Sequence, residues 1–371
     1  MNLQFEEHGG AYGGCLGIAT LNAEKTLNAL TLPMIEGLLA QIKAWAQNPR
    51  ISCVLLRGAG AKAFCAGGDV VSLVQACRGR PGEVPALAGR FFAAEYRLDY
   101  ALHTFEKPLL CWGHGYVLGG GMGLLQGAGV RIVTPSSRLA MPEISIGLFP
   151  DVGASWFLPR LPGKLGLFLA MTGAHVNATD AVQMGLADRL MGEDQQDALI
   201  DGLLQLNWQA QPRQQLTSLL QALEHDAMPL RPPTQWLAHR ALIDQGLDVA
   251  DASAAWKAIL RWQAHPDPLL ANAAQTLAKG CPLSARLCWE QQQRTRLMSL
   301  AEVLRLDYAM SLNCCRHPEF CEGVRARLID KDQTPHWHWP DVCSIPDAVV
   351  QAHFSKVWEG RHPLADLGTY P

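Results

Sequence analysis

Two acidic residues stand out as side chains able to do chemistry on a carbonyl group. Glu143 and Asp151 lie eight residues apart on a segment rich in proline and glycine, and their neighbours are mostly apolar. Apolar surroundings raise the pKa of a carboxyl group, and a second acid close by separates the two pKa values, which suits general acid–base or nucleophilic catalysis. A pair of surface loop acids is the competing interpretation, and the apolar neighbours favour a functional pair.

Two glycine-rich turns offer backbone N–H groups for the same chemistry. Glycines 119–121 follow one apolar run and precede another with helical spacing, and N–H groups at a helix start favour negative charge. Such amides can stabilise the oxyanion that forms when a carbonyl carbon is attacked. Gly68, in a second glycine turn over residues 63–69, can supply another amide. A purely structural role explains the first turn equally well, and the second turn better, when each is taken alone.

The other motifs argue against several classes of enzyme. The glycine pattern in residues 113–119 resembles a dinucleotide loop only weakly, because no acidic residue follows at the end of the next apolar run. The sequence contains neither the Gly-x-Ser-x-Gly motif of esterases nor the Walker A phosphate loop. His336, His338 and the pair Cys314–Cys315 have no second pair at ligand spacing, so we expect no metal site.

Up to about residue 190, strand-like and helix-like segments alternate. Short apolar runs bounded by turn residues predict buried strands over residues 15–21, 51–57, 108–112 and 130–134. Between the first two, Thr31 can cap a helix that ends at Asn48. This alternation predicts an α/β fold with a largely parallel sheet covered by helices.

After about residue 192 the strand-like runs disappear and helix signals prevail. Asp267–Pro268 predicts the start of one helix, and Ser299 with Glu302 forms the capping box of another. We therefore expect a core domain over residues 1–195 and a mostly helical C-terminal region over residues 196–371 that packs on the core.

Composition limits the partners and the location. The 371 residues carry 31 Lys and Arg against 34 Asp and Glu, and no basic run marks a nucleic-acid site. No apolar run reaches membrane-spanning length and the N-terminus does not resemble a signal peptide, so we expect no membrane partner. The 11 cysteines are odd in number and form no Cys-x-x-Cys pair, which indicates buried thiols in a reducing compartment. The expected location is the cytoplasm, or an organellar matrix if a transit peptide was removed.

Four ordered motifs between residues 10 and 190 together resemble the crotonase superfamily of enoyl-CoA hydratases and isomerases. They lie at residues 27–30, 63–69, 114–121 and 141–143. The resemblance implies a spiral of ββα units and an acyl-coenzyme A thioester as substrate.

The same resemblance assigns roles to the residues of these motifs. It implies that the amides of Gly68 and Gly120 form an oxyanion hole for the thioester carbonyl. It also implies that Lys25 to Ala29 and Ala63 to Cys65 lie along the coenzyme A moiety.

Departures from the superfamily pattern narrow the expected reaction. Gly123 stands where a hydratase carries one of its two glutamates, Glu143 matches the other, and Asp151 replaces a glycine of the following turn. Glu143 with Asp151 resembles the 3-hydroxyisobutyryl-CoA hydrolase branch, in which the acid matched by Glu95 contacts substrate. Further matches to this branch lie at residues 92–98, 157–166 and 322–337.

The sequence therefore predicts an acyl-CoA thioester hydrolase, with 3-hydroxyisobutyryl-CoA as the first substrate to test and valine breakdown as the setting. Glu143 would be nucleophile or general base, Asp151 would orient the substrate and shuttle protons, and Glu95 would bind the substrate hydroxyl. Coenzyme A is part of the substrate, so no separate cofactor is expected. The superfamily often forms trimers, which makes a homo-oligomer one expected state.

Two alternatives stay open at this point. One is an enoyl-CoA hydratase or isomerase that uses Glu143 alone as its proton carrier. The other is a catalytically silent relative that binds coenzyme A or RNA. Both acids and both glycines are present and no basic run is found, which argues against the silent relative.

Overall fold

The computed structural model describes residues 2–369, which fold into two compact units. Unit 1 contains residues 1–68, 98–139 and 176–235, and unit 2 contains residues 69–97, 140–175 and 236–371, of which residues 1, 370 and 371 lie outside the description. Each unit is therefore assembled from three separate stretches of the chain. The division at residue 195 stays a prediction about domain organisation.

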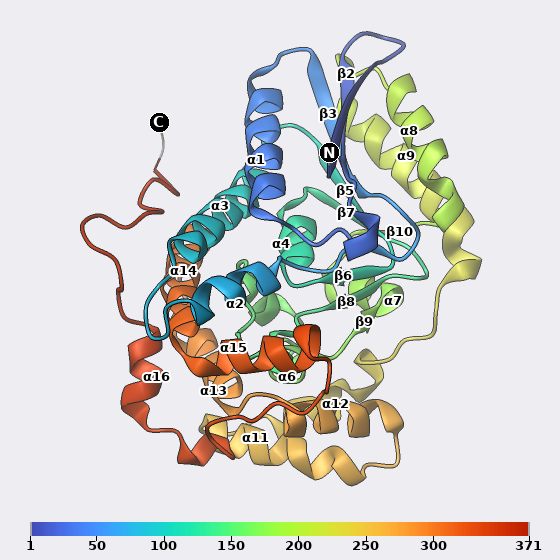
Figure 1. Cartoon of the computed structure of the whole chain (residues 1–371). Coiled ribbons are helices and arrows are strands. Elements are labelled where there is room, and N and C mark those ends of the chain that lie inside the picture. The colour runs from blue at the N-terminus through green and yellow to red at the C-terminus, as the bar shows by residue number, and fades with distance from the viewer. Residues whose placement is uncertain (1, 370–371) are drawn as a thin grey trace. The chain divides into compact units, whose positions relative to one another are not determined.

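Unit 1 is built around a six-stranded sheet with the strand order β1-β2-β3-β5-β7-β10 (Figure 1). The strands are β1 (Leu3–Gly9), β2 (Cys15–Leu21), β3 (Ile51–Gly58), β5 (Leu109–Gly113), β7 (Val130–Val133) and β10 (Arg189–Leu190). Only the pair β1–β2 is antiparallel. The four strands expected from the sequence are all present, each within one residue of its predicted ends, because short apolar runs between turn residues are typical of buried strands.

A second sheet contains four further strands that the sequence did not predict, just as it did not predict β1 and β10 of the first sheet. Its order is β4 (Ala63–Cys65), β6 (Tyr116–Leu118), β8 (Arg138–Ala140) and β9 (Val176–Asn177). Consecutive strands go to different sheets: β3, β5 and β7 join the first, and β4, β6 and β8 join the second. This alternation is the expected ββα pattern, and strands of three residues are too short to leave a periodic signal.

Helices cover the six-stranded sheet of unit 1. α1 (Leu32–Gln47), α4 (Gly120–Gly127), α7 (Ala178–Met184), α8 (Gln196–Gln205) and α9 (Pro212–Ala227) belong to this unit. Leucines of α8 and α9 pack in one buried cluster with side chains of β2, β3, β5 and β7. Thr31 lies at the cap position of α1, but its side chain makes no capping hydrogen bond, so that detail of the prediction was wrong.

Unit 2 is almost entirely helical. Its main helices are α2 (Val70–Arg78), α5 (Ala154–Phe157), α6 (Leu165–Thr172), α10 (Arg240–Gly246), α11 (Ala252–Leu260), α12 (Pro268–Lys279), α13 (Pro282–Thr295), α14 (Leu300–Arg316), α15 (Pro318–Val324) and α16 (Asp347–His353). α3 (Ala86–His103) begins in unit 2 and ends in unit 1. Asp267 caps α12 and Ser299 with Glu302 forms the capping box of α14, as predicted.

Two general features bear on the sequence expectations. The 11 cysteines are thiols rather than disulfides, and eight of them are buried. Over residues 2–369, none of the helices has both the length and the apolar character needed to cross a bilayer.

Candidate active site

The two glycine turns of unit 1 lie against each other because they follow paired strands. β4 and β6 are parallel, with Cys65 opposite Val117, so both chains leave the second sheet at the same edge. A Cβ atom built on Gly67 would lie 3.9 Å from the backbone nitrogen of Gly120. A Cβ atom on Gly121 would lie only 2.4 Å from the carbonyl oxygen of Cys65. Glycine is therefore required for the two turns to approach this closely.

The amide of Gly120 is oriented by the helix that it begins. Gly119 precedes α4 with a φ of 51°, a left-handed value that favours glycine, and Gly120 is the first residue of the helix. The first N–H groups of a helix have no acceptor within that helix and carry its positive end. Gly68 lies in the adjoining turn and pairs with Leu30 in a parallel bridge. The arrangement in unit 1 fits the binding of a developing oxyanion.

The buried side chain of Asn28 holds the loop at residues 25–29 next to these turns through hydrogen bonds. Asn28 is fully buried, and its side chain accepts a hydrogen bond from the Ala23 N–H (2.9 Å) and donates to the carbonyls of Ala59 (2.9 Å) and Ala63 (3.0 Å). Its own φ of 57° is left-handed, a conformation that asparagine tolerates better than most residues. Asn28 is thus a structural residue that the sequence motif contained but did not explain.

The residues expected along coenzyme A are all in unit 1, with different exposure. Lys25 is exposed, Ala29 is half-buried, and Ala63 is buried. Cys65 is fully buried and its thiol lies 3.7 Å from the Gly67 carbonyl. The backbone of this stretch is held to the neighbouring loop by the hydrogen bond from the Leu30 N–H to the Gly67 carbonyl (2.8 Å).

Unit 2 holds the three predicted acids, and all of them are buried. The carboxyl of Glu143 is 5% exposed and lies at the start of a short 3₁₀ helix (Glu143–Ile146). Its Oε2 has no hydrogen-bond partner within residues 2–369. Burial, and secondly the charge of Asp151, raises the pKa of Glu143 well above its usual value. The alternative interpretation, in which Glu143 and Asp151 are surface loop acids, is therefore wrong.

Asp151 is held by a buried tyrosine. Its carboxyl is 4% exposed, and its Oδ2 accepts a hydrogen bond of 2.7 Å from the hydroxyl of Tyr96 on α3. Burial raises the pKa of Asp151 to about 6, and the Tyr96 hydrogen bond works in the opposite direction by stabilising the ionised form.

The backbone around Asp151 forms a strained turn. The Ala154 N–H donates to the Asp151 carbonyl (2.8 Å), and the two residues between them have φ values of 49° (Val152) and 80° (Gly153). Positive φ at both central positions is typical of a type I′ turn, which glycine, asparagine and aspartate favour. A β-branched residue such as Val152 rarely adopts this conformation, so the surroundings must hold it.

Glu95 is buried on α3, next in sequence to Tyr96, and is 3% exposed. Glu95 is thus not in the solvated surface position that is usual for an acid on a helix. The sequence interpretation did not single out Tyr96, Asp307 or Ser311, all of which are fully buried in unit 2. The only available signal was the four-residue spacing of Asp307 and Ser311, which puts two polar side chains on one face of a helix otherwise rich in apolar residues.

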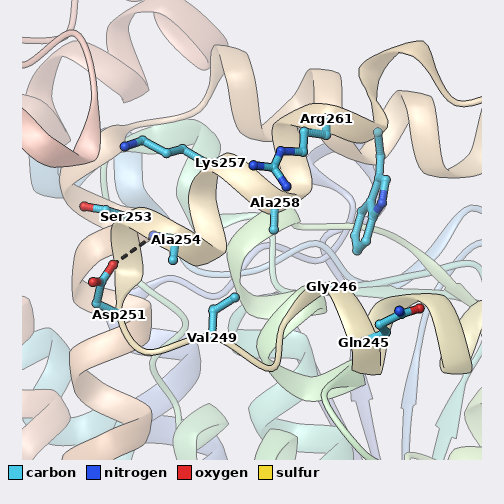
Figure 2. Close-up of a pocket in the computed structure, with 10 residues that line it drawn as sticks. Gln245, Gly246, Val249, Asp251, Ser253, Ala254, Lys257, Ala258 and Arg261 are labelled. Carbon is cyan, nitrogen blue, oxygen red and sulfur yellow. Dashed lines mark hydrogen bonds between the residues drawn. The ribbon is translucent and has the colours of Figure 1, made fainter.

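A separate pocket of about 510 Å³ lies between α10 and α11 in unit 2 (Figure 2). Figure 2 shows that Asp251 uses its carboxylate to cap α11, accepting a hydrogen bond from the Ala254 N–H (2.8 Å). None of the predicted catalytic or substrate-binding residues lines this pocket. The pocket is therefore separate from the candidate catalytic site.

Known proteins resemble this chain along almost its whole length. A family model described as enoyl-CoA hydratase/isomerase matches residues 16–354. The chain is 35% identical to 3-hydroxyisobutyryl-CoA hydrolase, mitochondrial, from Homo sapiens over 93% of this chain and 87% of that protein. The protein of the same description from Danio rerio is also 35% identical, over 93% and 88%.

Two solved structures share the fold. A carnitinyl-CoA dehydratase from Mycobacterium thermoresistibile has a TM-score of 0.83 at 32% identity, covering 96% of this chain and 97% of that one. An enoyl-CoA hydratase from Rhodobacter sphaeroides 2.4.1 has a TM-score of 0.80 at 29% identity, with the same coverage. The fold class expected from the motifs, α/β with crotonase-like ββα units and a helical C-terminal region, is thereby confirmed. The chain belongs to the enoyl-CoA hydratase/isomerase family.

Proposed function

We propose that this chain hydrolyses 3-hydroxyisobutyryl-CoA to 3-hydroxyisobutyrate and coenzyme A, a step that fits valine breakdown. The relatives named for this activity span 93% of the chain, including the helical C-terminal region. The substrate is an acyl-coenzyme A thioester. Coenzyme A enters the reaction as part of this substrate and leaves as a product, so the reaction needs no separate cofactor.

The buried pair of acids is the observation that carries this proposal. Glu143 has a carboxyl oxygen without a protein hydrogen-bond partner in the described chain, and Asp151 is held ready by Tyr96. Gly123 of α4 has no side chain to offer at the position where a hydratase is expected to carry its second glutamate. One reactive carboxylate with an auxiliary acid suits hydrolysis better than the addition of water between two glutamates.

Each proposed residue has one chemical role. The amides of Gly68 and Gly120 polarise the thioester carbonyl, and one such donor is typically worth ~10²–10³ in rate. The carboxylate of Glu143 attacks the carbonyl carbon, the C–S bond breaks, and the departing thiolate takes up a proton. Water then cleaves the resulting mixed anhydride, which restores Glu143. In the alternative route Glu143 removes a proton from water, which attacks directly.

The remaining residues bind and orient the substrate. Asp151 orients the acyl group and carries protons during the two steps, while Glu95 accepts a hydrogen bond from the substrate hydroxyl. Lys25, Ala29 and the backbone of residues 63–65 lie along coenzyme A. No metal ion takes part in this scheme.

A thiol-release assay over a panel of acyl-CoA esters tests the function. We expect 3-hydroxyisobutyryl-CoA to release coenzyme A fastest, and Glu143→Gln to lower kcat by about 10²–10⁴-fold, the usual contribution of a positioned acid–base group. Unchanged turnover in Glu143→Gln would instead support a silent, binding relative. No thiol release from any ester would contradict the proposal as a whole.

Isotope labelling separates the two routes. After turnover in ¹⁸O-water, label in the peptide that contains Glu143 shows attack by the carboxylate, because water that opens the anhydride at the glutamyl carbonyl leaves its oxygen on Glu143. Direct attack by water puts the label only in the product. Mass spectrometry of the digested protein gives the answer, and the same protein kept in ¹⁸O-water without substrate controls for non-specific exchange.

Hydration of an enoyl-CoA is the second candidate, because the two solved structures with the same fold are described as a dehydratase and a hydratase. This reaction consumes the enoyl absorbance without releasing a thiol. Measuring both signals in one sample distinguishes the candidates, and loss of absorbance alone would favour the hydratase.

Assembly and location are further proposals. A homo-oligomer is expected from the superfamily, and a solution mass equal to that of one chain would contradict it. The vertebrate relatives are described as mitochondrial, which agrees with an organellar matrix, and localisation of the tagged protein tests this.

A further inference from the structure

Helix α14 carries two fully buried polar side chains, Asp307 and Ser311, which lie one helical turn apart. Residues four apart in a helix project from the same face. Buried polar groups are costly unless they are hydrogen-bonded, so their partners indicate what they do. The hydrogen-bond partners of Asp307 and those of Ser311 both connect to Asp151 or its turn.

Asp307 holds the strained turn that carries Asp151. Its Oδ2 accepts a hydrogen bond of 2.9 Å from the Gly153 N–H, and its Oδ1 accepts one of 2.8 Å from Nε2 of Gln291 on α13. Gly153 and Val152 are the two residues with left-handed φ in that turn. A strained backbone persists only where its surroundings fix it, and Asp307 supplies a buried carboxyl acceptor at that place.

Ser311 acts on the other side of Asp151, through Tyr96. The Tyr96 hydroxyl lies 2.6 Å from the Ser311 hydroxyl and 2.7 Å from Oδ2 of Asp151. Tyr96 has one proton to donate, so when it donates to ionised Asp151 its oxygen must accept the proton of Ser311. If Asp151 is protonated, the same three groups can hydrogen-bond in the reverse direction. The chain of hydroxyls therefore accommodates both protonation states of Asp151.

Hydrogen bonds, rather than positively charged neighbours, favour the ionised form of Asp151. The titratable groups of unit 2 that interact with it are acids, a phenol and a thiol: Glu143, Asp307, Glu95 (through Tyr96), Tyr96 and Cys314. Burial is the main cause that disfavours ionisation of Asp151, and the hydrogen bond from Tyr96 stabilises its ionised form.

We propose that Asp307 and Ser311 are positioning residues for catalysis: Asp307 fixes the Asp151 turn through the Gly153 amide, and Ser311 fixes the Asp151 carboxylate through Tyr96. The helical C-terminal region thereby becomes part of the catalytic machinery rather than an appended layer. This inference rests on the proposed function in so far as Asp151 acts on the substrate.

Four variants test the Asp307 and Ser311 roles against a matched destabilising control. Asp307→Ala removes the acceptor of the Gly153 N–H, and Asp307→Asn keeps an oxygen there while the amide of Gln291 can rotate to meet it. Ser311→Ala removes the second donor, and Tyr96→Phe removes the first. Leu312→Ala, on the same helix and equally buried, deletes packing without touching these hydrogen bonds.

We expect Asp307→Ala to lower kcat by about 10- to 100-fold with a change in KM of less than about threefold, because a small displacement of a catalytic group is enough for such a loss. Asp307→Asn should recover most of the rate. The acid limb of the pH–kcat/KM profile should move to higher pH by up to about one unit in Tyr96→Phe and less in Ser311→Ala, since a lost hydrogen bond to the carboxylate raises its pKa. Leu312→Ala should leave both readouts unchanged.

A titration without substrate keeps this test separate from the proposed function. Carboxyl-carbon NMR of aspartate-labelled protein, with Asp151→Asn identifying the signal, gives the protonation midpoint of Asp151 directly. The proposal requires this midpoint to rise in Tyr96→Phe and Ser311→Ala but not in Leu312→Ala, even if no tested ester is hydrolysed. An unmoved midpoint in Ser311→Ala, or equal losses of kcat in Asp307→Ala, Asp307→Asn and Leu312→Ala, would overturn it.

Discussion

Glu143 must be ionised to attack a carbonyl carbon or to take a proton from water, yet its burial favours the protonated form. Desolvation is the larger cause of its raised pKa and the charge of Asp151 is the second. No described residue of the protein hydrogen-bonds Oε2 of Glu143, so this oxygen is available to substrate or water. At the scale of single residues, the site therefore combines reactivity with a requirement for sufficiently high pH.

This requirement predicts the pH dependence of the reaction. Because the ionised carboxylates are the active forms and both pKa values are raised, with that of Asp151 at about 6, kcat/KM should fall as the pH drops below neutral. An unperturbed glutamate would keep full activity down to near pH 5. Initial rates of thiol release between pH 5 and 9 measure the limb, and a flat profile down to pH 5 would contradict the assignment of these acids.

At the scale of secondary structure, glycine positions decide how the catalytic groups are presented. The turn after β4 and the start of α4 approach so closely that a side chain on Gly121 would collide with the Cys65 backbone. The left-handed turn after Asp151 is the corresponding device in unit 2. In both places the backbone conformation at the end of an element sets the direction of an amide or a carboxyl group.

We predict that Gly121→Ala lowers kcat by about 100-fold, since the new methyl group must push the two glycine turns apart and remove the alignment of an oxyanion donor. Gly129→Ala is the matched control, because a Cβ atom there would lie 3.7 Å from the Leu109 carbonyl oxygen, an ordinary van der Waals contact. Steady-state kinetics of the two purified variants give the comparison. Equal activity of both would show that the spacing of these turns is not limiting.

A second prediction at this scale concerns Asn28. Replacing Asn28 by Ala removes the donor to two carbonyls and loosens the loop at residues 25–29 that is proposed to lie along coenzyme A. We expect KM for the acyl-CoA ester to rise about 10-fold while kcat falls less, because the reacting groups are untouched. A fall in kcat with unchanged KM would place the function of this loop elsewhere.

At the scale of the whole molecule, burying several acids that catalysis is proposed to use lowers the free energy of unfolding at neutral pH. Glu143, Asp151 and Asp307 all have raised pKa values in the folded state, with burial as the first cause. The folded protein thus binds their protons more tightly than the unfolded chain does. Their contribution to stability is fully present below the ordinary carboxyl pKa and is lost as the pH rises through the raised values.

Asp151→Asn should therefore be more stable than the parent at pH 8 and equally stable near pH 4. The rise of the Asp151 pKa from 3.8 to about 6 sets an upper limit of about 3 kcal/mol for the difference at pH 8. Denaturant unfolding at the two pH values measures it, with the exposed Asp248→Asn as control. A parent protein that is more stable than Asp151→Asn at pH 8 would contradict the direction of the pKa shift.

The sequence by itself determined the features that are encoded locally. Apolar runs predicted four of the six strands of the larger sheet, and Asp267 and the Ser299–Glu302 pair predicted two helix starts. The glycine turns and acids indicated acyl chemistry, which the resemblance to crotonases narrowed to acyl-CoA thioesters. These signals survive in a linear sequence because periodicity, capping and turn chemistry involve residues only a few positions apart.

Only the tertiary structure decided which groups support the acids. Tyr96 meets Asp151 across 55 positions of sequence and Ser311 across 215, and Asp307 meets Gly153 across 154. Such contacts follow from the way α3, α13 and α14 pack, and no local pattern encodes them. The sequence also did not show the burial of Glu95, the interleaving of two compact units along the chain, or the strands of two or three residues in the smaller sheet. Each of these depends on long-range packing rather than on neighbouring residues.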